Sequence, residues 1–114
     1  MKIEKFEDIV GWQKAFLLAQ IIYSVFSDCK DFAFKNQIQR AVVSIMNNIA
    51  EGFERNTNDE FRQFLYIAKG SCGETRSMIH LAKSLQYISD ENASIIFTKS
   101  TEISKILSGL IKTL

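Results

Sequence analysis

The sequence predicts an all-α fold, an antiparallel up-down-up-down four-helix bundle formed by a single domain over residues 1–114. Three observations favour it. The chain contains no proline, a residue that helix interiors tolerate poorly and that loops usually contain. Apolar residues recur at steps of three and four through four segments, which places them on one face of each helix. With 46% hydrophobic and 24% charged residues, the chain can bury a core without disulfides or metals.

The first expected helix covers about residues 8–27. Its stripe at helical spacing, which we expect to face the core, contains Ile9, Trp12, Phe16, Ala19, Tyr23 and Phe26. A polar stretch over residues 28–30 and a connection over 31–36 lead to a second helix, which ends near Arg55. The inward stripe of this second helix contains Ile38, Ala41, Val42, Ile45, Ile49 and Phe53.

The second helix has a wider apolar surface than one bundle easily covers. Val43, Met46 and Ala50 lie beside the main stripe and extend it over more than half of the circumference. Either this helix is unusually central, or its second edge contacts another subunit. We favour the subunit contact because the patch is wide.

Capping residues mark the starts of the last two helices. Thr57 and Glu60 form a predicted capping box, in which the hydroxyl and the carboxylate each satisfy a free backbone N–H. The helix that follows should be the longest, with a stripe of Phe61, Phe64, Leu65, Ala68, Cys72, Thr75, Ile79, Ala82 and Gln86. Ser89, followed by two acidic residues, begins the fourth helix. Its stripe contains Ile96, Ser100, Ile103, Leu107, Leu110 and Leu114.

Composition argues against several classes of protein. The net charge is only +1, so no global charge would attract nucleic acid or a membrane surface. The apolar stretch over residues 15–23 is interrupted by Gln20 and is shorter than the roughly 20 residues of a membrane span. Charges of both signs at residues 2–8 differ from a secretory signal. We therefore expect a cytoplasmic protein in which Cys29 and Cys72 are free thiols.

The sequence contains no arrangement that predicts catalysis. His80 is the only histidine, and no nucleophile beside it is identifiable. No Glu has a His three residues later, as a di-iron bundle would require. Gly70 and Gly73 lie inside a predicted helix, where we interpret them as sites of close helix packing rather than as a phosphate loop. We expect no enzyme activity, no catalytic or metal-binding residues, no cofactor and no small-molecule substrate.

Two polar surfaces are candidate binding sites. The first lies on the second helix and contains Arg40, Ser44, Asn48, Glu51 and Arg55 at steps of four, four, three and four. It is either a face for a protein partner or a structural feature, namely a Glu51–Arg55 ion pair with hydrogen bonds at a subunit contact. We favour the structural interpretation.

The second surface is a basic stripe on the third helix, formed by Arg62, Lys69, Arg76 and Lys83 at seven-residue spacing. It extends over about 30 Å and has Tyr66 and His80 between its members, so it could follow the phosphates of a nucleic acid. Basic side chains flanking a core produce the same pattern without any ligand, and the low net charge favours this solvated flank.

Several motifs resemble those of the 23S rRNA-intervening-sequence protein family, also called the four-helix-bundle protein family. The matching segments are Trp12-Gln13-Lys14-Ala15, residues 39–45, Asn48-Ile49-Ala50-Glu51-Gly52-Phe53 with Arg55, Glu60-Phe61, Phe64-Leu65, Ile67-Ala68, Gly70-Ser71, Glu74, Leu81-Ala82 and Tyr87-Ile88. The chain departs from the family pattern at Met46, where proline is usual, and at Cys72, where leucine is usual. The connection over residues 31–36 also lacks the usual proline and glycine.

The resemblance implies a four-helix bundle that assembles into a ring-shaped homopentamer. It also implies kinship with the accessory variability determinant proteins of diversity-generating retroelements, which bind a reverse transcriptase and nucleic acid. The function we expect is therefore that of a homo-oligomeric scaffold or adaptor with a protein partner. The alternative is a nucleic-acid-binding accessory protein that uses the basic stripe.

Overall fold

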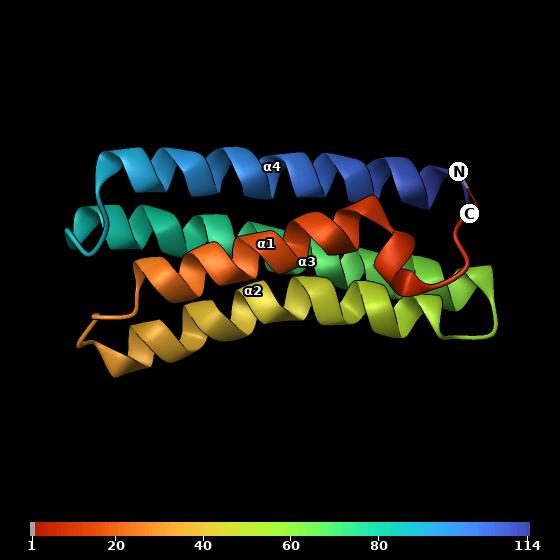
Figure 1. The fold of residues 1–114 in the computed structure, drawn as a ribbon, viewed down its shortest axis with the longest axis horizontal. Coiled ribbons are helices and arrows are strands. Elements are labelled where there is room, and N and C mark those ends of the chain that lie inside the picture. The colour runs from red at the N-terminus through yellow and green to blue at the C-terminus, as the bar shows by residue number, and fades with distance from the viewer. Residues whose placement is uncertain (1) are drawn as a thin grey trace.

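The computed structural model describes residues 2–114, which form four long helices lying side by side (Figure 1). A short 3-10 turn η1 (Phe6–Asp8) precedes α1 (Val10–Val25), α2 (Phe32–Phe53), α3 (Asn58–Ser84) and α4 (Asp90–Lys112). Each helix packs against its neighbours in the cyclic order α1, α2, α3, α4, while the diagonal pairs make no close backbone contact within residues 2–114. The predicted antiparallel up-down-up-down bundle is confirmed, and α3, with 27 residues, is the longest helix as expected.

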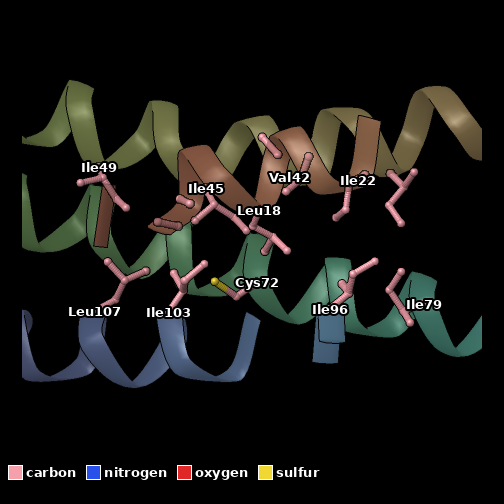
Figure 2. Close-up of a cluster of buried hydrophobic side chains, with 14 of the residues drawn as sticks. Leu18, Ile22, Val42, Ile45, Ile49, Cys72, Ile79, Ile96, Ile103 and Leu107 are labelled. Carbon is pink, nitrogen blue, oxygen red and sulfur yellow. The ribbon is translucent and has the colours of Figure 1, made fainter. Parts of the chain in front are cut away.

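Large aliphatic side chains from all four helices meet along the axis of the bundle (Figure 2). The stripes predicted for α2, α3 and α4 supply most of them, and fully burying one such side chain stabilises the fold by about 1.5–3 kcal/mol. Two buried hydroxyls satisfy their hydrogen bonds within their own helices: Thr75 donates to the carbonyl of Ser71 at 2.9 Å and Ser100 to that of Ile96 at 2.8 Å. These polar residues therefore fit inside the apolar core.

The stripe predicted for α1 is wrong in part. Three of its members are buried as expected, namely Ile9, Ala19 and Phe26, but Trp12 is half-buried and Phe16 and Tyr23 are exposed. The residues that face the core inside the helix are small or aliphatic: Gly11, Ala15, Leu18, Ala19 and Ile22. Because α1 is apolar on almost every side, a spacing of three and four residues fits more than one face.

Several predicted ends also differ. α1 begins at Val10 rather than near residue 8, because η1 occupies Phe6–Asp8. α2 begins at Phe32, so the expected connection over residues 31–36 is mostly helical, and the Asp31 carboxylate caps the helix by accepting from the N–H of Phe34 at 3.1 Å. The helix then continues unbroken through Met46. At its other end, Phe53 is half-buried rather than buried.

The prediction that Gln86 lies on the inward stripe of α3 is wrong. This residue lies beyond the helix with a φ of +60°, while the N–H of Tyr87 bonds the carbonyl of Ala82 at 2.8 Å and that of Gln86 bonds Lys83 at 3.0 Å. The pattern is a Schellman motif, which terminates a helix through one left-handed residue. Within the predicted stripes, Phe64, Leu110 and Leu114 are half-buried rather than buried.

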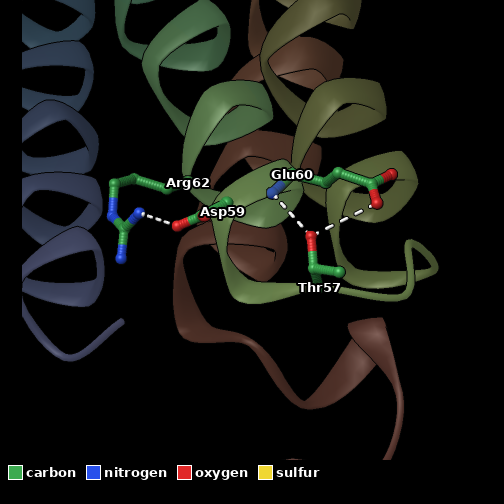
Figure 3. A network of polar contacts seen from close by, with 4 residues as sticks. All are labelled: Thr57, Asp59, Glu60 and Arg62. Atoms are coloured by element: carbon green, nitrogen blue, oxygen red, sulfur yellow. Dashed lines mark hydrogen bonds and ion pairs between the residues drawn. The ribbon is translucent and has the colours of Figure 1, made fainter.

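The capping signals of α3 and α4 are confirmed with one difference. The Thr57 hydroxyl accepts from the N–H of Glu60 and the Ser89 hydroxyl from that of Asn92, both at 3.1 Å. The Glu60 carboxylate, however, accepts from the Thr57 hydroxyl at 3.2 Å instead of from a backbone N–H (Figure 3). The capping box is therefore only half formed.

The expected role of Gly70 and Gly73 in close packing is wrong. A Cβ at either position would meet nothing within 4 Å. The tight approach lies instead between α2 and α3 at Gly52, where a Cβ would lie 2.6 Å from the Cβ of Phe64. Small residues in a helix allow another helix to approach closely, but they do not indicate the side on which that helix lies.

Candidate functional site

The structure separates the four cations of the basic stripe into different surroundings. Arg62 donates to the Asp59 carboxylate at 2.6 Å in the first turn of α3 (Figure 3), and Lys83 is exposed near the other end of the helix. Lys69 instead donates to the hydroxyl of Ser108 at 2.6 Å and to that of Ser104 at 3.4 Å, both on α4. Only Lys69 and Arg76 share one groove, so the stripe is not a uniform track.

That groove lies between α3 and α4 and has a volume of about 630 Å³. We call it the α3/α4 groove, and its lining residues are Lys69, Arg76, Thr101, Ser104, Lys105, Ser108, Gly109 and Lys112. The lining thus combines four cations with three hydroxyl groups and includes no carboxylate. Since like charges repel at this range and no acid in the lining compensates them, the groove is suited to an anion.

Sequence reasoning missed the half of the groove that α4 supplies. A signal was present, because Lys105 and Lys112 repeat at the same seven-residue spacing as Lys69 and Arg76. Thr101, Ser104 and Ser108 follow at steps of three and four, on the same side of α4. These repeats indicate a polar edge, but which helix lies opposite that edge depends on the packing of the bundle.

The polar stripe of α2 is also divided. Asn48 donates to the carbonyl and to the hydroxyl of Ser44, each at 2.8 Å, and Ser71 of α3 donates to the Ser44 hydroxyl at 2.9 Å. The middle of the stripe is therefore bonded inside the chain, between α2 and α3. Within the single chain, Ser44 and Asn48 direct these hydrogen bonds along α2 and to α3.

The ends of the α2 stripe are exposed. The predicted ion pair joins Arg55 to Glu51 at 3.2 Å, and the Arg55 guanidinium also lies 4.9 Å from the centre of the Phe64 ring, a cation–π contact. Arg40 is exposed at the other end and lines a shallow groove with Tyr23 of α1 and Val43 of α2. Arg40 is thus an exposed stripe residue that forms no ion pair within the described chain.

Large apolar side chains are exposed on the outward side of α1, on either side of a polar strip of Gln13, Gln20 and Ser24. From the sequence, the wide apolar surface was expected on α2 instead. Four side chains of α1 keep large exposed fractions: Val10 at 49%, Phe16 at 40%, Leu17 at 54% and Tyr23 at 46%. The Phe16 ring stacks on Trp12 with 5.3 Å between ring centres. By contrast, Val43, Met46 and Ala50 of α2 are half-buried. We call the four exposed side chains the α1 outer face.

Charge is almost absent from this helix. Lys14 is the only charged residue in Val10–Val25, and it pairs with Glu102 of α4 at 3.2 Å. Large apolar side chains that gather at the surface commonly mark a contact with another protein. The α1 outer face is therefore the clearest candidate contact surface of the described chain.

Titratable groups gather at the end of the bundle that carries the loops over residues 26–31 and 85–89. The Tyr87 hydroxyl donates to the Asp31 carboxylate at 2.8 Å. The backbone N–H of Phe34 and then this hydroxyl lower the pKa of Asp31, and the same bond raises the pKa of Tyr87. This contact joins the α1–α2 loop to the α3–α4 loop.

The two cysteines and the histidine belong neither to the α3/α4 groove lining nor to the α1 outer face. Cys72 is buried in the core, and burial raises the pKa of its thiol to about 11. Cys29 is half-buried in the loop after α1, and neither thiol forms a disulfide. His80 is exposed and packs against Phe97, with ring centres 4.6 Å apart.

Within residues 2–114, no three His, Cys, Asp or Glu side chains come together as metal ligands would. In the same part of the chain, no helix combines the length and the apolar character needed to cross a bilayer.

Comparisons with known proteins agree with the fold. No curated protein matches the chain. A solved crystal structure of a protein of unknown function from the S23 ribosomal protein family of Bacteroides thetaiotaomicron matches with a TM-score of 0.84 and 32% identity, covering 90% of this chain and 99% of that one. The model of the 23S rRNA-intervening sequence protein family matches residues 7–109. This chain therefore belongs to the 23S rRNA-intervening sequence protein family.

Proposed function

We propose that the chain is a non-enzymatic, homo-oligomeric scaffold or adaptor in the cytoplasm, with the homopentameric ring that its family resemblance implies. The observation that carries the proposal is the α1 outer face. Four large apolar side chains there are exposed by 40% or more, on a helix with one charged residue. Covering this surface with another copy removes apolar area from water, at about 25 cal/mol per Å².

Assembly through α1 gives the other surfaces a role. The second copy would cover Leu17 and Phe16, while the polar ends of the α2 stripe at Arg40 and Arg55 would remain available to a protein partner. A ring also repeats each such surface once per subunit, so a weak contact gains strength from multiple attachment.

The experiment is a measurement of mass in solution by light scattering during size-exclusion chromatography. The parent chain is expected to elute with the mass of several copies, and Phe16→Glu combined with Leu17→Glu is expected to reduce this mass. The two charges would be buried in the contact without partners, which is strongly unfavourable.

Ser94→Glu combined with Thr98→Glu is the matched control, since it places two charges at exposed positions of α4 and should leave the mass unchanged. Circular dichroism must show helical spectra for all variants. A strictly monomeric parent chain would refute the proposal, and so would a Phe16/Leu17 variant that keeps the full mass.

A second candidate function is that of a nucleic-acid-binding accessory protein, in the manner of the accessory variability determinant proteins that act beside a reverse transcriptase. The α3/α4 groove favours it, because four cations line that groove and no carboxylate does. In this role the apolar face would assemble the ring and the groove of each subunit would contact phosphates.

Salt dependence tests the second candidate. Binding of a labelled single-stranded RNA should weaken steeply between 50 and 200 mM salt if several phosphates are neutralised, because counterions are released on binding. Fluorescence anisotropy over a salt series measures this dependence. An absence of binding at the lowest salt would exclude the second candidate and leave the scaffold proposal standing.

A further inference from the structure

We propose that the α3/α4 groove is a phosphate-binding site in which Ser104 and Ser108 position the Lys69 ammonium for the ligand. The inference rests on the second candidate function and deepens it. The basic stripe lies on α3 alone, whereas the site proposed here lies between α3 and α4. Half of the cations, Lys105 and Lys112, and the hydroxyls at 101, 104 and 108 then come from α4.

The first line of support is the concentration of cations in one groove. Among the described residues, three cations pair with carboxylates, namely Lys14, Arg55 and Arg62, and most of the other cations are spread singly over the surface. The groove has no such partner, although it gathers four cations. An anion in the groove would relieve their mutual repulsion, and charged groups held near low-dielectric helix walls focus this attraction.

The second line is the geometry of the hydroxyls. Ser108 and Ser104 accept from the Lys69 ammonium at 2.6 and 3.4 Å, so each has an oxygen lone pair directed toward the cation. A hydroxyl also has one proton to donate, and neither serine uses it as a donor in a side-chain hydrogen bond within the described chain. These protons are therefore available to the same anion that the ammonium attracts.

The combination selects one ligand chemistry. Ammonium and guanidinium groups can only donate hydrogen bonds, and the two serine hydroxyls each still have a proton to donate. The groove therefore favours a negatively charged ligand with several oxygen atoms that accept hydrogen bonds. A phosphate group meets this need. Lys69 and Arg76 are seven residues apart on α3, as are Lys105 and Lys112 on α4. This spacing corresponds to about 10 Å along the helix axis, which leaves room for more than one phosphate.

The shape favours successive phosphates over one enclosed ion. The groove is open to solvent along its length and has a volume of about 630 Å³, within the usual range for ligand sites. An extended single strand presents its phosphates one after another to such a groove. Free phosphate shares the same chemistry, so the experiment includes both.

The main test compares two double variants for binding of a labelled 20-nucleotide oligouridine. Lys105→Gln with Lys112→Gln removes two groove cations, and Arg62→Gln with Lys83→Gln removes two stripe cations outside the groove. The groove variant is expected to raise Kd at least about tenfold at low salt. It should also reduce the slope of log K against log salt by about 1.4, the value for two single-strand phosphates.

The stripe variant is the matched control, because it makes the same change in net charge. It is expected to change Kd less than the groove variant. If the stripe variant abolishes binding and the groove variant retains it, the inference is wrong and the second candidate function stands. If the parent chain binds no strand and no phosphate, both are wrong.

A separate experiment tests whether Ser104 and Ser108 position the Lys69 ammonium. Ser104→Ala with Ser108→Ala leaves the charge unchanged, so the salt slope should persist while Kd rises several-fold. A merely structural role would instead lower the melting temperature without affecting Kd. Unchanged Kd in the serine variant would overturn the positioning part of the inference.

Inorganic phosphate distinguishes the two sources of the ligand. Amide shifts in a nitrogen-15 NMR titration with sodium phosphate, at constant ionic strength set by sodium chloride, should map to residues 101–112, Lys69 and Arg76. Shifts confined to those residues without strand binding would support a free-phosphate site and exclude the second candidate function. Shifts spread over the whole surface would indicate screening alone and would overturn the inference.

Discussion

The α1 outer face and the α3/α4 groove belong to the same bundle but differ in almost every chemical respect. The face is formed by large apolar side chains on a helix with one charge, whereas the groove is lined by cations and hydroxyls. Exclusion of water would lower the free energy of the face, and binding of an anion would lower that of the groove. Two surfaces of opposite chemical character can thus coexist because the core needs only one side of each helix.

Adjacent leucines in α1 give the sharpest test of the face, and the largest expected effect. Leu18 is fully buried, so Leu18→Ala should destabilise the fold by about 2–5 kcal/mol. Leu17 is 54% exposed, and Leu17→Ala should change monomer stability by about 0.5 kcal/mol or less. Urea unfolding at low protein concentration measures both, and equal losses would contradict the assignment of the two sides of α1.

Two glycines, Gly52 of α2 and Gly70 of α3, distinguish a tightly packed position from an open one. Gly52→Ala should cost about 1–3 kcal/mol, because its Cβ would clash with Phe64. Gly70→Ala should instead stabilise by about 0.5–1 kcal/mol, since nothing lies within 4 Å and alanine is the better helix former. Thermal melts of the two variants should shift in opposite directions. A loss at Gly70 would indicate a contact with another copy there.

Salt should affect the two surfaces differently. Lys105→Gln relieves repulsion in the groove, so it should raise the melting temperature slightly at low salt, and the gain should vanish at high salt. Leu17→Gln on the α1 outer face should show no such dependence, because no charge changes. Calorimetry at two salt concentrations compares them. A salt-independent effect of Lys105→Gln would mean that the groove charges do not interact.

The smallest effect is expected at the contact between the two loops. The pKa of Asp31 is lowered in the folded state, so its contribution to stability is present above its usual value of 3.8 and is lost as pH falls through the folded pKa. The pKa of Tyr87 is raised, so its contribution is present below 10.0 and is lost as pH rises through the folded value.

Tyr87→Phe should therefore weaken the pH dependence of stability at both ends of the range. Melting temperatures at pH 3, 7 and 11 measure this. Because the backbone N–H of Phe34 is the larger cause of the Asp31 shift, part of the acid dependence should survive. Its complete loss would contradict this order of causes.

Much of the fold could be predicted because local signals agree with tertiary packing in three of the four helices. In α2 and α4, clear alternation of apolar and polar faces identified buried residues such as Ile45 and Ile103. The caps at Thr57 and Ser89 were readable because they depend on residues three apart. The rotation of α1 was not predictable, since a helix with apolar residues on all sides has no unique inward face.

The candidate sites were predictable only as far as one helix determines them. The Glu51–Arg55 ion pair lies within a single turn and was expected. The bond between Ser44 and Ser71, and the position of Lys69 against Ser108, depend on how two helices are rotated and shifted relative to each other. Periodicity contains no such information. The same reason explains why the α4 half of the groove was missed.

The burial of Cys72 has a consequence for measuring how this bundle opens. With a pKa of about 11 and no exposed area, the thiol has almost no reactive thiolate at neutral pH. An alkylating reagent can modify it only when the helices separate around it. Cys29 is half-buried in a loop and should react first. The rate at which Cys72 is modified would thus report the rate or extent of unfolding of the bundle under native conditions.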